Sequence, residues 1–332
     1  MLEIGVDLGG TKCAVCLGEI VDDNVKILHK CAVRPTKSVP AEKMQKLLSD
    51  DIRFCAQRAG GIGGVCGIGV SCGGPLDSRA GLILSPPNLP GWDRVPVTDY
   101  FTEKTGLRAW LCNDADACAL AEWKLGAGKG CSNMIFLTFG TGLGAGLILN
   151  GRLYKGSCDM AGEVGHIRLE NWGPCGYGKA GSFEGFCSGG GIAQLAKLMI
   201  LEQLQSGKQP ALCRGENGME GVTAARVGEF AKTGDPLARE ILRRVGVQLG
   251  KGLSILMDVL NPERIVIGSI FARCYDEIYP FAEQVIEREA LPAVRKNCRV
   301  VPSTLLENVG DAAALMTAKY NYETELEHEG IQ

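Results

Sequence analysis

The first part of the chain consists of short apolar runs separated by turn residues. These runs predict strands at 3–8 and 13–20, and a third strand at 25–33 after a turn of Asp and Asn residues. Apolar residues at helical spacing over 41–59 predict an amphipathic helix, and a buried strand is expected at 67–71. The pattern is therefore three strands in a meander, then a helix, then another strand.

A second series of elements begins near residue 108. A buried strand is predicted at 108–112 and a helix at 115–125. Strands are then expected at 133–138 and 145–150, joined by a turn rich in glycine. This arrangement of strand, glycine-threonine turn and strand repeats the one at the N-terminus. We therefore expect an internal duplication, with two lobes facing one cleft.

The remainder of the chain is predicted to be mostly helical. The expected elements are helices at 188–205, 222–232, 236–260, 275–289 and 310–320, with strands at 264–267 and 299–302. The polar tail 323–332 is expected to fray.

Composition indicates a globular protein of about two domains. The chain has 332 residues, 45% of them apolar and 22% charged, and a net charge of −3. That charge gives no reason to expect nucleic acid or an anionic membrane as a partner. We find no signal peptide and no apolar run long enough to span a bilayer. Fifteen cysteines scattered through apolar segments indicate core thiols in a reducing compartment, so the cytoplasm is the expected location.

Two glycine-threonine turns, at 9–12 and 140–142, are candidates for binding phosphate. Glycine lets backbone N–H groups approach a phosphate closely, and a threonine hydroxyl is a further donor. Either turn alone is more simply a tight hairpin. Two copies on either side of one strand–helix junction favour phosphate binding. The segment 140–145 also fits a loose dinucleotide-binding pattern, which we reject because that pattern needs a following helix and a strand is expected here.

Asn113 and Asp114 lie at that junction, between the strand 108–112 and the helix 115–125. Asp is a favoured helix cap, so Asp114 has a purely structural interpretation. A carboxylate at this place is also held on a rigid edge, where a catalytic base can act. The paired turns favour the catalytic interpretation.

His166 is the one histidine of three that lies in a glycine-rich motif, and Glu163 precedes it by three residues. An isolated histidine is more often structural than a ligand. Glu184 follows in another glycine-rich segment. The two glutamates are candidate acceptors for hydroxyl groups, or else solvated surface charges.

Taken in order and at this spacing, the motifs resemble the ROK family of sugar kinases and sugar-responsive repressors, over nearly the whole chain from Asp7 to Ala313. The resemblance implies an α/β, two-lobed actin-like (ribonuclease H-like) ATPase fold, with an internally duplicated mixed sheet and a central cleft. It implies a small lobe of residues 1–112, to which a C-terminal helix of about 310–332 returns, and a large lobe of residues 113–309.

The resemblance also implies a role for each motif. Asp114 would be the catalytic base. ATP with Mg²⁺ would be bound by Asp7, Gly9, Gly10, Thr11, Lys12, Thr141, Gly142 and Gly268, with Asp7 near the metal. The sugar would be contacted by Gly74, Asn88, Asn113, Asp114, Glu163, His166 and Glu184.

A structural zinc, usual in the family, is not expected. Two of the three thiolate positions read Tyr177 and Ser182, which leaves Cys175 and His166 as ordinary ligands in the segment. Cys158 and Cys187 lie nearby in sequence and could complete a rearranged site only if the loops took another route, which is the minority interpretation. We expect glycines and the packing of Tyr177 and Phe183 to hold this segment instead.

The implied activity is ATP-dependent phosphorylation of the 6-hydroxyl of a hexose, with glucose first and an N-acylhexosamine (N-acetylglucosamine or N-acetylmannosamine) second. A regulator is disfavoured, because the family's repressors carry a helix-turn-helix before the first phosphate loop and this sequence reaches Asp7 without room for one. A catalytically idle relative is disfavoured by the retention of Asp7, Thr11, Asp114 and Thr141. The expected partners are small molecules and a second copy of the chain, as a homodimer.

Overall fold

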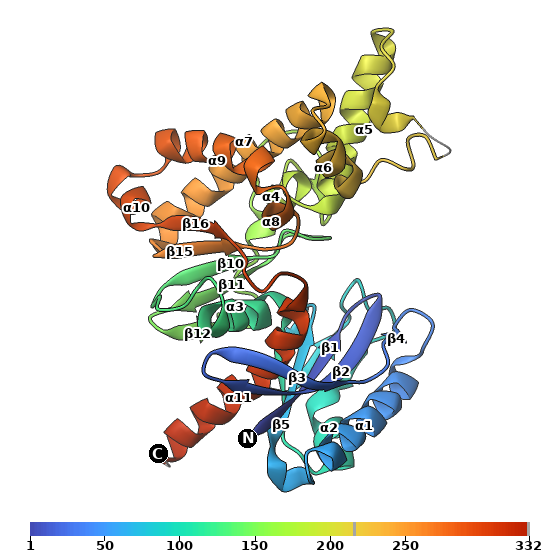
Figure 1. The fold of residues 1–332 in the computed structure, drawn as a ribbon, viewed down its shortest axis with the longest axis vertical. Helices are drawn as coiled ribbons and strands as arrows, with labels where there is room; N and C mark the ends of the chain where they lie inside the picture. The colour runs from blue at the N-terminus through green and yellow to red at the C-terminus, as the bar shows by residue number, and fades with distance from the viewer. Residues whose placement is uncertain (215–216, 331–332) are drawn as a thin grey trace. The chain divides into compact units, whose positions relative to one another are not determined.

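A computed structural model describes residues 1–214 and 217–330, which form two compact units (Figure 1). The first unit contains Met1–Gly130, Gly146–Ala161 and Glu307–Gln332. The second contains Cys131–Ala145 and Gly162–Leu306. The helix after Asn113 belongs to the first unit, so this division does not coincide with the expected boundary between residues 112 and 113.

The first sheet has the strand order β3-β2-β1-β5-β9. Its strands are β1 (Leu2–Leu8), β2 (Lys12–Val21), β3 (Asn24–Lys30), β5 (Val65–Cys72) and β9 (Ala109–Asn113), and β4 (Arg34–Pro35) pairs with β2. The pairs β1–β2 and β2–β3 are antiparallel, whereas β1–β5 and β5–β9 are parallel. The predicted meander, helix and buried strand are thus confirmed.

The second sheet repeats this order as β12-β11-β10-β15-β16. Its strands are β10 (Met134–Leu137), β11 (Ala145–Leu149), β12 (Arg152–Tyr154), β15 (Arg264–Ile267) and β16 (Arg299–Pro302). As in the first sheet, the later strands pair in parallel, β10 with β15 and β15 with β16. The shared order confirms the internal duplication.

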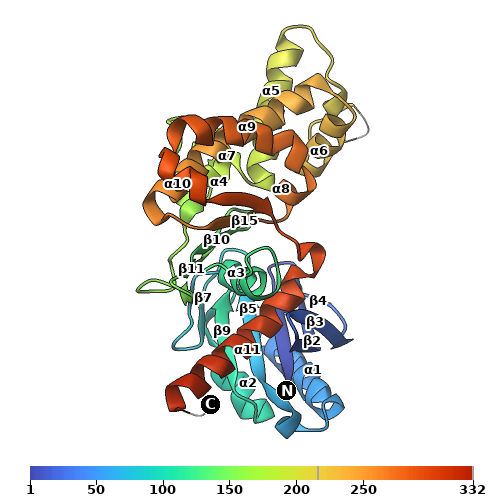
Figure 2. The same cartoon turned by 60° about the vertical axis from the view of Figure 1, so that its left-hand side comes forward.

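Helix α11 (Val309–Glu329) packs on β1, β5 and α3 (Asp114–Leu125) in the first unit (Figure 2). Small residues allow this close approach: a Cβ on Gly69 would lie 2.1 Å from the Ala314 carbonyl oxygen. The prediction of a frayed tail is wrong for residues 323–329, which are helical. They are held because Glu325 accepts a hydrogen bond from Trp110 Nε1 at 2.8 Å and pairs with Arg108 at 2.7 Å. Residues 331–332 lie outside the described part.

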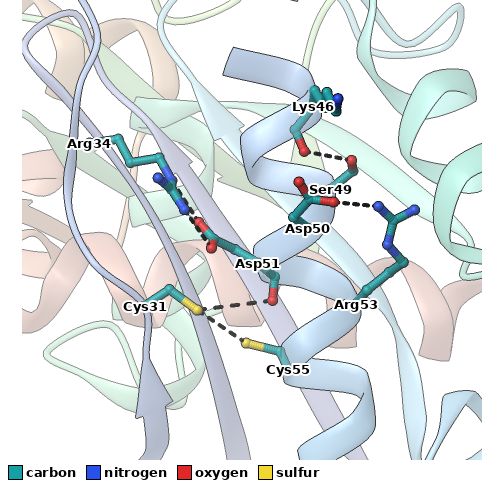
Figure 3. Close-up of polar contacts among 8 residues, drawn as sticks. All are labelled: Cys31, Arg34, Lys46, Ser49, Asp50, Asp51, Arg53 and Cys55. Atoms are coloured by element: carbon teal, nitrogen blue, oxygen red, sulfur yellow. Dashed lines mark hydrogen bonds and ion pairs between the residues drawn. The ribbon is translucent and has the colours of Figure 1, made fainter. Parts of the chain in front are cut away.

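Helix α1 (Ala41–Arg58) packs its apolar side, including Met44, Leu48 and Ile52, into a core shared with β1, β2 and β5. Arg34 fixes the segment after β3 to this helix through two hydrogen bonds to Asp51, at 2.8 and 2.7 Å (Figure 3). Most of the fifteen cysteines are buried, in keeping with the predicted core role.

The sequence pattern did not reveal a small sheet of β6 (Leu76–Asp77), β7 (Leu82–Leu84) and β8 (Asp93–Pro96), nor the helix α2 (Val97–Thr105) that follows it. These strands are too short to show a period. The remaining elements are β13 (Cys175–Gly176), β14 (Lys179–Ala180), α4 (Phe183–Phe186), α5 (Gly189–Gln205), α6 (Ala224–Lys232), α7 (Pro236–Leu260), α8 (Ile270–Arg273), α9 (Tyr275–Glu289) and α10 (Pro292–Asn297). Within the described ranges, no helix is both long and apolar enough to cross a bilayer.

Candidate active site

At the junction of β9 and α3, the helix cap and the candidate catalytic carboxylate are two different residues, which the sequence alone did not distinguish. Asn113, not Asp114, is the helix cap: its φ of −60° and ψ of 145° are extended, and its Oδ1 accepts a hydrogen bond from the Ala115 N–H at 2.9 Å. Asp114 is the first helical residue, and its Oδ1 shares the same donor at 2.8 Å. The helix start is therefore satisfied without Asp114.

The Asp114 carboxyl combines solvent access with a desolvated environment. The residue is exposed, yet surrounding protein raises the pKa of the carboxyl through desolvation, against the opposing effect of backbone hydrogen bonds. The two properties are compatible, because access depends on an open path to the side chain, while desolvation depends on how much protein surrounds it. A raised pKa makes a carboxylate a better proton acceptor near neutral pH.

Asp7, at the end of β1, lies in an electronegative environment. Its pKa is raised to about 6, chiefly by desolvation and then by the charges of Asp311 and Asp114, with Lys12 and Lys30 acting in the opposite direction. Lys30 Nζ donates to both oxygens of Asp311, at 2.8 and 2.6 Å. A carboxylate of this kind is a candidate oxygen ligand for a divalent cation. Among the described residues, however, no group of three or more His, Cys, Asp or Glu side chains is placed to hold a metal ion.

The first glycine turn joins β1 to β2. The Gly9 N–H donates to the Lys12 carbonyl at 3.1 Å, and the side chain and N–H of Thr36 donate to the Gly9 and Thr11 carbonyls at 2.7 and 3.0 Å. Thr11 and Lys12 are exposed. The turn is thus held from behind while its own threonine and lysine remain available to a ligand.

The predicted sugar-side residues of the first unit gather beside this turn. A Cβ on Gly10 would lie 2.7 Å from the Cβ of Asn88, so only glycine fits there. The Asn88 amide nitrogen lies 3.1 Å from the Cβ position of Gly73, and that of Asn113 lies 3.3 Å from the Cβ position of Gly74. The structure therefore brings together residues from four segments, which the sequence could only name one by one.

In the second unit, the turn at 140–142 adjoins two other predicted segments. Glu184 Oε2 accepts a hydrogen bond from the Leu143 N–H at 3.0 Å and lies 2.7 Å from the Cβ position of Gly142. The Gly268 N–H donates to the Leu137 carbonyl at 3.0 Å, which places the end of β15 beside the strand that enters the turn. Thr141 is exposed. The turn, Glu184 and Gly268 thus lie in one region of this unit.

Glu163 directly precedes a short 3₁₀ turn, Val164–His166, whose last residue is His166, and both residues are exposed. The His166 N–H donates to the Glu163 carbonyl at 3.2 Å, and the His166 ring meets Tyr177 edge-on, with centroids 6.1 Å apart. Lys179 Nζ donates to the His166 carbonyl at 2.7 Å. The backbone around His166 is therefore fixed, while its ring remains accessible.

The segment 175–184, in which no zinc site was expected, is held by hydrogen bonds and packing. Ser182 is buried and caps α4, accepting from the Gly185 N–H at 3.0 Å. Cys175 is exposed, and its backbone pairs with the Gln194 amide at 3.0 and 2.9 Å. Phe183 is buried as expected, but the expected packing of Tyr177 is wrong, because this side chain is 72% exposed at the tip of the β13–β14 hairpin. These residues do not fit a tetrahedral zinc site.

Asp311 and Lys30 were not selected from the sequence as site residues. Asp311 lies in the Gly-Asp motif that opens α11, and a Cβ on Gly310 would lie 3.4 Å from Asp7 Oδ2. That motif was a usable signal. The sequence around Lys30 contains no such signal, since only the tertiary structure brings this residue of β3 to Asp311 in α11.

Comparison with known proteins gives three findings. The pattern that defines the ROK family matches residues 3–320. The chain is 33% identical to the glucokinase of Halalkalibacterium halodurans over 314 residues, which are 92% of each chain. It is also 30% identical to the xylose repressor of Caldicellulosiruptor bescii over 268 residues, 80% of this chain and 65% of the repressor.

Among solved structures, a ROK family glucokinase from Streptomyces griseus, in complex with glucose and AMPPNP, aligns with a TM-score of 0.73. It is 28% identical, and the alignment covers 96% of this chain and 99% of that one. With the repeated strand order, this confirms the α/β fold with an internally duplicated mixed sheet.

Proposed function

Because this chain belongs to the ROK family, we propose that it is an ATP-dependent sugar kinase that phosphorylates the 6-hydroxyl of a hexose, glucose first. The observation that carries the proposal is the state of Asp114. Asp114 is an exposed residue, and the surrounding protein raises the pKa of its carboxyl through desolvation. The helix does not need it as a cap, because Asn113 has that role. The similarity to glucokinases supports the same reading.

Asp114 accepts the proton of the sugar hydroxyl, which frees that oxygen to attack the terminal phosphate of ATP. Its backbone is fixed at the strand–helix junction, so the carboxylate is held in one direction. In phosphoryl transfer, orientation of this kind and the neutralisation of charge supply most of the rate enhancement. Asn113, Asn88 and Gly74, which lie together, contact the sugar hydroxyls.

The remaining site residues have the following roles in this proposal. Gly9, Gly10, Thr11 and Lys12 donate to phosphate oxygens in the first unit, and Thr141 and Gly142 do so in the second, where Gly268 faces the adenosine. Asp7 would hold Mg²⁺, which neutralises phosphate charge when bound. Glu163, His166 and Glu184 are sugar contacts. We also propose that the protein is cytoplasmic and forms a homodimer. Analytical sedimentation, which measures the mass of the assembly, tests the homodimer.

Two alternatives remain open. The sugar-side residues serve hydroxyl groups common to glucose and the N-acylhexosamines, so a kinase for the latter is the second candidate. The identity with a repressor favours a sugar-responsive regulator as the third.

A coupled assay of ADP release over a panel of hexoses and N-acylhexosamines separates these three functions. We expect sugar-dependent turnover, highest with glucose. A higher kcat/KM for an N-acylhexosamine would assign the second activity. If no sugar of the panel is turned over, but calorimetry shows that one of them binds, the chain is a regulator.

A further inference from the structure

One carboxylate outside the residues assigned so far joins two distant segments of the first unit. Asp159 lies in the loop 155–161 after β12, and both of its oxygens accept from Ser78: Oδ2 from the N–H at 2.8 Å, and Oδ1 from the hydroxyl at 2.7 Å. Lys155 Nζ donates to the same hydroxyl at 3.2 Å. Hydrogen bonds to an ionised carboxylate are about twice as strong as neutral ones.

Ser78 lies in the turn between β6 and β7, and this turn is stiff. Asp77 Oδ1 accepts from the Arg79 and Ala80 N–H groups at 3.0 and 2.9 Å, which closes an Asx turn. The Gly81 carbonyl accepts from Val97 at the start of α2, at 3.0 Å. A displacement at Ser78 is therefore transmitted to both strands of the hairpin.

The same hairpin carries two predicted sugar contacts. Gly74 lies two residues before its first strand, and Asn88 lies in the loop between β7 and β8. The loop is anchored to the hairpin, because the Ser85 N–H donates to the Trp92 carbonyl at 2.9 Å and the Trp92 side chain is buried. Asn88 itself is exposed. The position of Asn88 thus depends on the position of the hairpin.

We propose that Asp159 is a positioning residue for sugar binding, which holds the β6–β7 turn through Ser78 and thereby sets the place of Asn88. The proposal rests on the proposed function. We expect a smaller effect on ATP: Asn88 lies against Gly10 of the first glycine turn, but Thr36 also holds that turn from a segment outside this hairpin.

The test compares steady-state kinetics of Asp159→Asn, Asp159→Ala and Ser78→Ala with those of the wild-type chain. The asparagine has the same shape but carries no charge, so it loses the charge-assisted bonds to Ser78, and its single oxygen can accept from only one of the two Ser78 donors in the present geometry. We expect the sugar KM to rise about tenfold, a smaller effect than the roughly hundredfold cost of displacing a positioning group by about 1 Å. The ATP KM and kcat should stay within about twofold. Ser157→Ala, an exposed change in the same loop, is the matched control and should behave as wild type.

The double variant Asp159→Asn/Ser78→Ala should be much less impaired than the sum of the two single variants, because both changes act on the bond between the Ser78 hydroxyl and Asp159 Oδ1. An unchanged sugar KM in both Asp159 variants would overturn the proposal. So would a parallel rise in both Michaelis constants, which indicates a general effect on the fold. If the wild-type chain binds sugar without turnover, the kinase function fails, and calorimetric sugar affinities of the same variants still decide this proposal. No sugar binding at all would overturn both.

Discussion

Replacing Asp114 by alanine should abolish most of the activity while leaving the fold intact. The Ala115 N–H keeps Asn113 Oδ1 as its acceptor, at 2.9 Å, so the helix start loses little. Desolvation raises the pKa of Asp114 in the folded state, so the ionised carboxylate weakens the fold at neutral pH and its removal is neutral or stabilising. We therefore expect no fall in Tm.

The loss of the base should lower kcat by about 10²- to 10⁴-fold, the usual contribution of general-base catalysis. This corresponds to about 3 to 5 kcal/mol in the barrier, at about 1.4 kcal/mol for each factor of ten. The sugar KM should change little, because Asn113 and Asn88 still contact the hydroxyls. Asp114→Asn, which keeps the shape, should lose kcat to a similar degree.

Asp235→Ala is the matched control. Asp235 caps α7, with Oδ1 accepting from the Ala238 N–H at 2.8 Å. This variant should lose about 0.5 to 2 kcal/mol of stability and keep its kcat. Thermal melts and a coupled assay with saturating sugar and ATP measure both quantities. The reasoning is refuted if Asp114→Ala keeps kcat within tenfold of wild type, or if its activity loss follows a loss of stability like that of the control.

Three further predictions follow from the structure. Thr11→Val and Thr141→Val should each raise the ATP KM up to about tenfold, since each removes one donor to phosphate; unchanged ATP kinetics in both would contradict phosphate binding by the paired turns. Burial raises the pKa of Glu3 to about 7, so the folded state retains this proton longer than the unfolded state and the free energy of unfolding should fall as the pH rises from about 4.5 to 7. Glu3→Gln should remove that dependence and be more stable at pH 8 by at most about 3 kcal/mol, measured by urea unfolding; a variant with the wild-type pH dependence would exclude Glu3 as its source. The purified protein should carry no structural zinc, and its activity should survive chelation once Mg²⁺ is restored; stoichiometric zinc by elemental analysis would show that His166 and Cys175 have other partners.

The position of α11 illustrates why some contacts could not be predicted. The sequence indicated a helix of small residues near 310–320, but its length and packing depend on partners elsewhere. Glu325 extends the helix because Trp110 and Arg108 of β9 are beside it. The same packing brings Asp311 and Lys30 towards Asp7. No local pattern contains this information, since the partners are hundreds of residues apart.

The sequence by itself determined the duplicated arrangement of strand, glycine turn and strand, most of the longer helices, and the strand–helix junction at Asn113. These features are encoded by apolar periodicity and turn chemistry, which act over a few residues. Only the tertiary structure decided that Asn113 is the cap, that Asn88 lies against Gly10, and that Ser182 supports its segment in place of a thiolate. The physical reason is that capping depends on backbone angles set by the flanking strand, and the approach of two segments depends on which glycine leaves room for a distant side chain.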